Sequence, residues 1–289
     1  MKRTHRIPLA VALALVTIGA ASCGASAGPE VISDPRPTST TSEPTPDPAG
    51  GDEIVWQEFT RGGFVPAELA LGQVPAVTIY ADGRIIVATR DADFGADTAV
   101  DLQEDEIPAA DLEAFLADAE GSGLFRPGTD YGDPMITDLP STSVTLRTGG
   151  VPATVDVYAL EHELDHTVGG VSAEQAARRA ELKQLLAEGR ALATDPKPYV
   201  PERVRANLFP PPTVEPDEDP VAWPGPPRSA FPELTDDTTT SCLVIEGPDA
   251  AEVAAASAEN EDGFWTIDGA VAQITVTPLL PGNEGCPPR

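Results

Sequence analysis

The chain has 289 residues, with 18 lysines and arginines against 47 aspartates and glutamates, and a formal net charge of −29. A surface this acidic repels the phosphates of nucleic acids, so we expect no nucleic-acid partner. The length leaves room for more than one core of ordinary domain size. We expect the net charge to keep the protein soluble and monomeric.

An export signal is predicted for residues 1–22. Lys2, Arg3 and Arg6 precede the apolar run IPLAVALALVTIGAA, which is too short for a comfortable membrane span. Removal of this segment takes away three basic and no acidic side chains, so the net charge of the remaining chain falls from −29 to −32.

Small residues lead from the signal directly into a cysteine, in the order Ala20-Ala21-Ser22-Cys23-Gly24. This order resembles the lipobox of bacterial lipoproteins, although Ala20 stands where leucine is usual. The resemblance implies that Cys23 takes a diacylglycerol, becomes the new N-terminus and anchors the protein at the extracellular face of the cell membrane. The alternative is an ordinary secretory signal that is cut near Ala25-Ser26-Ala27.

Residues 23–52 are predicted to form a disordered tether. They are rich in Pro, Ser, Thr and Gly and nearly devoid of large apolar side chains. Such a segment cannot bury enough surface to offset the entropy cost of ordering the chain. A tether of this kind would hold a folded body clear of a membrane surface.

The first folded domain is predicted for residues 53–194. EIVWQEFTRGGFV has the character of a strand that ends in a Gly-Gly turn. VTIYADGRIIVATR predicts two antiparallel strands around Asp82-Gly83, in the pattern of a type I′ hairpin. PAADLEAFLADAEG then predicts an amphipathic helix that starts after Pro108 and stops at Gly121.

A second hairpin and a second helix follow in the same domain. The hairpin pairs a strand at 142–148 with a strand at 153–160, across Gly149-Gly150. Ser172 and Gln175 form a predicted capping box at the start of the helix. Its expected buried stripe consists of Ala176, Leu182, Leu185 and Leu186. The order of elements predicts an α+β fold, with an antiparallel sheet and two helices on one of its faces.

The stretch His162-Glu163-Leu164-Asp165-His166 matches HExxH, the zinc-binding signature of metallopeptidases. On a helix the two histidines would lie one turn apart and could share one Zn²⁺. The preceding residues have strand periodicity, however, and Gly169-Gly170 separates the stretch from the next helix. In an extended segment the histidines would be about 13 Å apart, too far to share an ion. We therefore predict a solvated loop at 162–166, with no metal and no catalytic residue.

Other candidate sites in the sequence are weaker. The acidic stretch 91–101 lacks the Gly and Glu that an EF-hand loop needs at its sixth and twelfth positions. The aspartates within 129–138 suit turns without a metal. After the signal, no Walker, dinucleotide or GxSxG motif occurs, so we expect no cofactor.

Residues 195–236 are dense in proline and are predicted to be a connector without helix or interior strand. Its large apolar side chains, Leu208, Phe209, Trp223 and Phe231, suggest that much of the connector is ordered against a folded module.

A small α+β module is predicted for residues 237–289, in the order strand, helix, hairpin. A module of this size is rarely stable without a covalent cross-link or a metal. Cys242 in its first strand and Cys286 after its last strand are an even pair, which predicts a disulfide in an oxidising compartment.

Three stretches of the chain, GGFVP, IYADGR and CLVIEG through to PLLPGNEGC, resemble a class of uncharacterised secreted or lipid-anchored proteins of actinomycetes. The resemblance implies fold and location, and it supplies no activity.

Two hypotheses for function follow. The favoured one is a membrane-anchored extracellular lipoprotein with a non-catalytic role, which binds a ligand or envelope partner that the sequence does not identify. The alternative is a zinc metallopeptidase that uses His162, Glu163 and His166.

Overall fold

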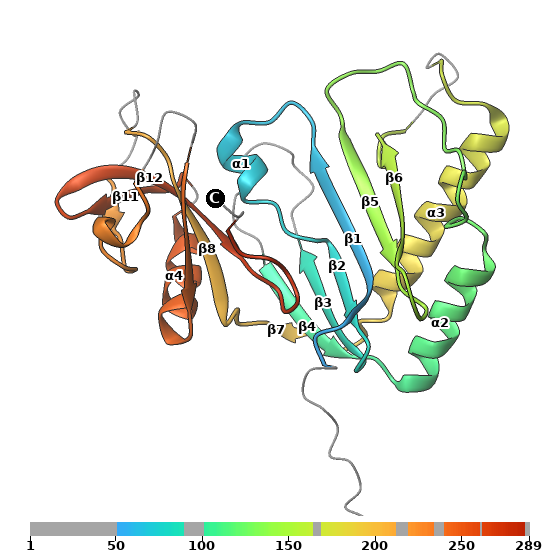
Figure 1. Cartoon of the computed structure of the whole chain (residues 1–289), viewed down its shortest axis with the longest axis horizontal. Coiled ribbons are helices and arrows are strands. Elements are labelled where there is room, and N and C mark those ends of the chain that lie inside the picture. The colour runs from blue at the N-terminus through green and yellow to red at the C-terminus, as the bar shows by residue number, and fades with distance from the viewer. Residues whose placement is uncertain are drawn as a thin grey trace, which may run out of the picture. The chain divides into compact units, whose positions relative to one another are not determined.

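The structure is a computed structural model that describes residues 51–89, 101–163, 169–211, 219–233, 240–260 and 262–286. By the contacts between its residues the chain divides into Met1–Thr45 and Pro46–Arg289. All described residues belong to the second unit, which contains two β-sheets (Figure 1).

The first sheet has seven strands in the order β6-β5-β1-β2-β3-β4-β7, and every neighbouring pair is antiparallel. The strands are β1 (Ile54–Gly62), β2 (Val77–Tyr80), β3 (Arg84–Thr89), β4 (Asp101–Glu106), β5 (Pro140–Leu146), β6 (Ala153–Tyr158) and β7 (Lys197–Pro198). The predicted pairing of the second hairpin is confirmed, because β5 and β6 pair in register from Ser141↔Tyr158 to Leu146↔Ala153.

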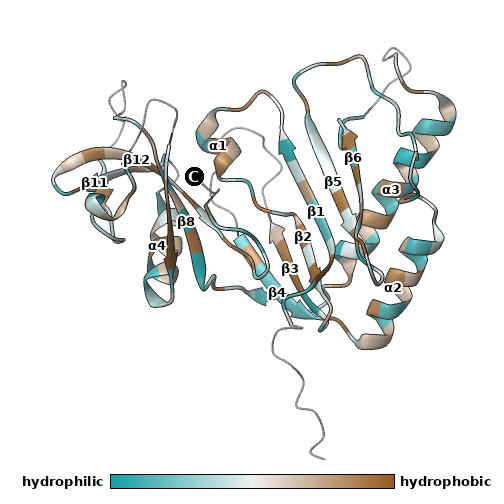
Figure 2. Cartoon of the chain, in the orientation of Figure 1, coloured by the Kyte–Doolittle hydropathy of each residue, from teal (hydrophilic) through white to brown (hydrophobic). Residues whose placement is uncertain are grey.

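Two helices, α2 (Ala109–Gly121) and α3 (Ala173–Ala191), cover one face of this sheet (Figure 1). Hydrophobic residues of both helices face the strands (Figure 2). The α+β class, the antiparallel sheet and the placement of the helices are therefore confirmed. So is the capping box, because Ser172 accepts a hydrogen bond from the Gln175 backbone N–H and the Gln175 side chain accepts one from the Ser172 N–H.

Trp56 lies at the centre of this helix-covered face. Its side chain is fully buried and meets Phe115 of α2 edge to face, with ring centroids 5.0 Å apart. From α3, Gly189 comes close to the same two rings, and a Cβ added there would lie 3.0 Å from the Phe115 ring. Both helices therefore pack around one tryptophan of β1.

The predicted stripe of α3 is right at three positions and wrong at one. Leu182, Leu185 and Leu186 are buried, but Ala176 is exposed and Arg179 is buried in the same part of the helix. The reason is local, because Arg179 reaches under the end of β6 to bind backbone carbonyl oxygens there.

The opposite face of the first sheet has a smaller cluster of buried residues. Its members are Val74, Tyr80, Ile86, Leu102 and Leu280. Leu280 lies after β12 (Ala270–Pro278), so the last described segment of the chain packs on this face of the first sheet. The short helix α1 (Ala67–Leu71) connects β1 to β2.

The second sheet has five strands in the order β10-β8-β12-β11-β9. Its elements are β8 (Arg203–Leu208), β9 (Val221–Ala222), the 3₁₀ turn η2 (Arg228–Ala230), β10 (Ser241–Glu246), the helix α4 (Pro248–Glu259), β11 (Phe264–Ile267) and β12 (Ala270–Pro278). All neighbouring pairs are antiparallel except β9 and β11, which are parallel. α4 packs on one face over Val204, Ile245 and Trp265.

The prediction that the proline-dense segment holds no interior strand is wrong. β8 lies within it and pairs with β10 on one side and β12 on the other. The run Arg203–Leu208 contains no proline, and its alternate residues Val204, Ala206 and Leu208 face the core. Prolines flank the strand and do not interrupt it, so every ladder donor is present. The expectation that the large apolar residues of this segment are ordered is confirmed, since Leu208, Phe209, Trp223 and Phe231 are buried.

Two Asp-Gly turns close hairpins in different ways. At Asp268-Gly269 both residues have positive φ, 51° and 79°, as a type I′ turn requires. At Asp82-Gly83 only the glycine does, and its N–H donates to the Tyr80 carbonyl. The type I′ turn predicted there is wrong, because the strands are joined by three residues with glycine in the left-handed position.

Candidate functional site

The HELDH stretch begins just after β6. Ala159 has a positive φ of 51°, and its carbonyl oxygen accepts a hydrogen bond from the His162 backbone N–H. His162 and Glu163 are not in a helix, as predicted. Residues 164–168, which include His166, lie outside the described residues. The zinc hypothesis needs His166, so it stays a prediction. Within the described part of the chain, no group of three His, Cys, Asp or Glu side chains is arranged to hold a metal ion.

A buried arginine holds the chain where it enters this stretch. One guanidinium nitrogen of Arg179, Nη2, donates to the carbonyl oxygens of Tyr158 and Ala159, at 2.7 and 2.6 Å. The other, Nη1, lies 3.4 Å from the Tyr131 carbonyl oxygen. Burial lowers the pKa of Arg179. Backbone carbonyl oxygens therefore stabilise the positive charge of Arg179, and the arginine holds this turn in place.

Glu58 is a buried acid with a raised pKa. It lies on β1, on the same face as Trp56, and is only 3% exposed. One carboxylate oxygen lies 3.1 Å from Nη2 of Arg190, while the other is buried without a hydrogen-bond partner. Burial raises the pKa of Glu58 to about 7, and the opposing effect of Arg190 is smaller.

This carboxyl group changes charge near neutral pH, and its side chain pairs with one arginine. Its partner Arg190 is half exposed and sits in the last turn of α3. We therefore assign Glu58 an effect on the pH dependence of stability.

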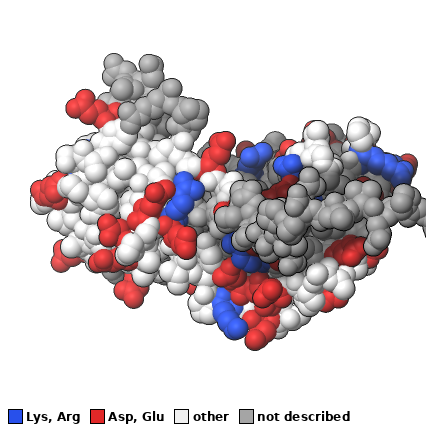
Figure 3. Space-filling model, turned by 60° about the horizontal axis from the view of Figure 1, so that its bottom comes forward, with Lys and Arg blue, Asp and Glu red and all other residues white. Residues whose placement is uncertain are grey.

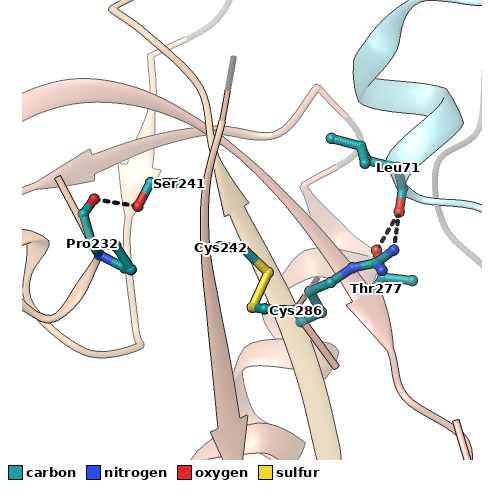
Figure 4. The surroundings of a disulfide bond; sticks show 7 residues. Leu71, Pro232, Ser241, Cys242, Thr277 and Cys286 are labelled. Atoms are coloured by element: carbon teal, nitrogen blue, oxygen red, sulfur yellow. Dashed lines mark hydrogen bonds between the residues drawn. A yellow bond between two sulfur atoms is a disulfide. The ribbon is translucent and has the colours of Figure 1, made fainter. Parts of the chain in front are cut away.

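The predicted disulfide is present between Cys242 of β10 and Cys286, with the Cα atoms 5.7 Å apart (Figure 4). Residues 279–286, here called the C-terminal strap, run between β12 and this bond. Leu280 of the strap is buried against the first sheet, and the Pro281 carbonyl oxygen accepts a hydrogen bond from the Tyr80 hydroxyl, at 3.1 Å. The disulfide therefore closes a loop that reaches from the second sheet to the first and back.

Polar contacts join the second sheet to the short helix α1. The Thr277 hydroxyl donates to the Leu71 carbonyl oxygen at the end of α1, at 2.7 Å (Figure 4). Arg205 Nη2 donates to the same oxygen, at 2.9 Å. The side-chain nitrogen of Asn207, on the same face of β8, is buried without a hydrogen-bond partner. This face of the second sheet is polar because it meets a helix end, where carbonyl groups lack intrahelical donors.

The predicted lipidation site and all but the last two residues of the predicted tether lie outside the described residues, as does nearly all of the acidic stretch 91–101. Lipidation at Cys23 stays a prediction. Among the helices that the structure describes, none has the length and apolar character to cross a membrane.

Sequence reasoning missed both Glu58 and the strap. For Glu58 a signal was present, because it stands two residues after Trp56 in a strand and so shares the face of the core. For the strap there was none, since contacts such as Tyr80 with Pro281 join residues 201 positions apart.

No protein-family model, curated protein or solved structure matches the chain. The resemblance to secreted or lipid-anchored proteins of actinomycetes depends on the three stretches quoted above, and it stays a prediction.

Proposed function

We propose that the protein is a membrane-anchored extracellular lipoprotein with a non-catalytic binding role in the cell envelope. One observation carries the proposal. The chain has three cysteines, two of them form the Cys242–Cys286 disulfide, and the third is Cys23, directly after the predicted export signal. A disulfide suits an exported protein, and a cysteine at the end of a signal suits lipid attachment.

The anchor sets the range over which the body acts. The tether of residues 23–52 would place the body a few tens of ångströms from the membrane, on coil scaling of about 5–6 Å times the square root of residue number. The two glycerol-linked chains of a lipoprotein are enough for stable attachment, where a single chain would be marginal. The partners of the protein would then be components of the membrane, the wall or other envelope proteins.

Detergent phase partitioning tests the anchor. We expect the exported wild type to enter the detergent phase and the Cys23→Ala variant to stay in the aqueous phase. Cys242→Ser is the matched control, because it changes a cysteine that the proposal does not lipidate, and it should partition as the wild type does. Equal release of wild type and Cys23→Ala into the medium would replace the lipoprotein with a freely secreted protein.

A zinc metallopeptidase is the second candidate, because the HExxH match at 162–166 is literal. Metal analysis of the purified chain separates the two proposals. Stoichiometric zinc that is lost in His162→Ala would establish a metal site. Absence of bound zinc after purification with added zinc would contradict the zinc peptidase hypothesis.

A further inference from the structure

A shallow groove runs along α2, between this helix and the turns that follow β2 and β5. Its volume is about 420 Å³, within the range of ligand sites in proteins. The side chains of Leu112, Leu116 and Ala117 line it from the helix. Leu112 is buried in the core, Leu116 is half-buried and Ala117 is exposed, so the floor is apolar and open to solvent.

Carboxylates border this apolar floor. Glu113 and Glu120 line the groove from α2, and Asp82 lines it from the hairpin turn. Asp82 already binds Arg84, with Oδ2 2.9 Å from Nε. Among the described residues, neither Glu113 nor Glu120 forms an ion pair. Two exposed acids on the groove are therefore available to a partner.

The acids of α2 do not serve the helix itself. Its thirteen residues include four acids and no lysine or arginine, and no basic residue stands in its last turn. Glu120 is next to the C-terminal residue of the helix, where the macrodipole is negative and a negative side chain is unfavourable. α3, on the same face of the sheet, has Glu174 in its first turn and Arg190 in its last. The charged residues of α2 therefore make its interaction with the helix dipole less favourable than that of α3.

The charges also restrict what can occupy the groove. A second copy of the chain brings a net charge of −32 once the signal is removed, so it would be repelled. The tether of residues 23–52 has five acids and one base, so it too is a poor match. Acidic side chains exceed basic ones over the face of the molecule in Figure 3 as well. The complementary occupant is a different molecule, which carries positive charge beside apolar side chains.

We propose that the α2 groove is a docking site for a basic, amphipathic segment of another envelope protein. Apolar side chains of the segment would pack on Leu112, Leu116 and Ala117, and its lysines or arginines would pair with Glu113 and Glu120. This is the helix-in-groove mode of recognition, with charge at the rim to select the partner. The proposal rests on the binding role proposed above and does not depend on lipidation of Cys23.

Peptide binding by calorimetry or fluorescence anisotropy tests the groove. The protein is the exported chain with Cys23→Ala, used without detergent because micelles would bind a cationic peptide themselves. The probe is a synthetic helical peptide with leucines at i, i+3 and i+4 spacing and lysines on the opposite face. We expect saturable one-to-one binding that weakens as the salt concentration rises from about 0.05 to about 0.5 M. The same peptide with glutamate in place of lysine should not bind.

Matched variants locate the binding. Removing both rim charges with Glu113→Gln and Glu120→Gln should weaken binding by about fivefold to tenfold. Asp111→Asn with Asp118→Asn removes the same charge from the same helix, outside the groove, and should leave the affinity within about twofold. Ala117→Trp fills the groove at an exposed helix position and should abolish binding while every acid remains.

Two results would overturn the proposal. One is absence of lysine-peptide binding to a chain whose circular dichroism and unfolding show that it is folded. The other is equal weakening by the two pairs of charge variants, which would mean general attraction to an acidic surface. Neither result bears on the anchor, which detergent partitioning tests separately.

Discussion

The seven-stranded sheet has two faces, and the protein covers them in different ways. On one face α2 and α3 bury a large apolar cluster around Trp56, and the helices and the strands of this cluster all lie within the first domain. On the other face a smaller cluster includes Leu280 of the C-terminal strap, which polar contacts and a disulfide hold in place. The first face depends on burial of apolar area, and the second on closure of the chain. The two should therefore respond to different perturbations.

The largest effect is expected from Trp56→Ala, on the helix-covered face. The substitution removes the side chain that touches Phe115 of α2 and lies beside Gly189 of α3, so it leaves a cavity between both helices. We expect a loss of about 3–5 kcal/mol in the free energy of unfolding. Urea unfolding followed by circular dichroism measures it. Trp223→Ala, in the other core, is a control for the loss of a tryptophan and should leave α2 and α3 protected from hydrogen exchange.

The next largest effect is expected from opening the disulfide, on the strap-covered face. Cys242→Ser with Cys286→Ser removes a link between residues 44 positions apart, which should lower the free energy of unfolding by about 3–4 kcal/mol. Because the strap packs on the first sheet, hydrogen exchange should speed up in β2 and β3 as well as in the second sheet. Faster exchange confined to the second sheet would show that the disulfide staples only its own module.

A third prediction uses pH to perturb the helix-covered face. The pKa of Glu58 rises from its ordinary value of 4.5 to about 7 in the folded protein, because burial disfavours its charge. Between these values the folded state holds a proton that the unfolded state has lost, so folding becomes less favourable as pH rises. We expect Glu58 to reduce the free energy of unfolding by up to about 3 kcal/mol between pH 4.5 and pH 7.

Glu58→Gln should flatten this part of the stability profile, measured by urea unfolding at a series of pH values. Glu246→Gln is the control, because Glu246 also pairs with an arginine but is mostly exposed. It should leave the slope between pH 4.5 and 7 unchanged. An identical slope in wild type and Glu58→Gln would contradict the assignment.

The two faces also differ in how much of them the sequence predicts. The helix-covered face follows from local patterns, such as the helical spacing of Leu112, Phe115 and Ala119 and the cap at Ser172. The strands β4 and β8 were not predicted, for different reasons. β4 reads DLQEDE, which is too acidic for a typical strand, and β8 is flanked by prolines within a proline-dense segment. In both cases pairing with neighbours outweighs the local preference.

Of the candidate sites too, only the part that depends on local sequence could be predicted. Counting cysteines was enough to predict the Cys242–Cys286 bond, because a small exported module needs an even pair. It could not predict that the strap beside this bond also contacts Tyr80, since that contact depends on the tertiary arrangement. The α2 groove was not predicted either. Asp82 of the hairpin turn and Glu120 of the helix are far apart in the sequence, and they line one groove only in the folded protein.

The smallest effect is expected from Tyr80→Phe, which removes only the hydroxyl that binds the Pro281 carbonyl oxygen. A neutral hydrogen bond of this kind contributes about 1 kcal/mol, so the variant should lose about that much in the free energy of unfolding. The Tyr80→Phe variant is most informative when it is combined with loss of the disulfide in a double-mutant cycle.

If the disulfide holds the strap on the first sheet, Tyr80→Phe should cost about 1 kcal/mol in the free energy of unfolding of the oxidised protein. It should cost close to nothing in Cys242→Ser with Cys286→Ser. Tyr131→Phe, whose hydroxyl binds the Leu124 carbonyl on the helix-covered face, should cost the same in both backgrounds. Equal costs for Tyr80→Phe with and without the disulfide would mean that Leu280 and its neighbours hold the strap without help from the covalent bond.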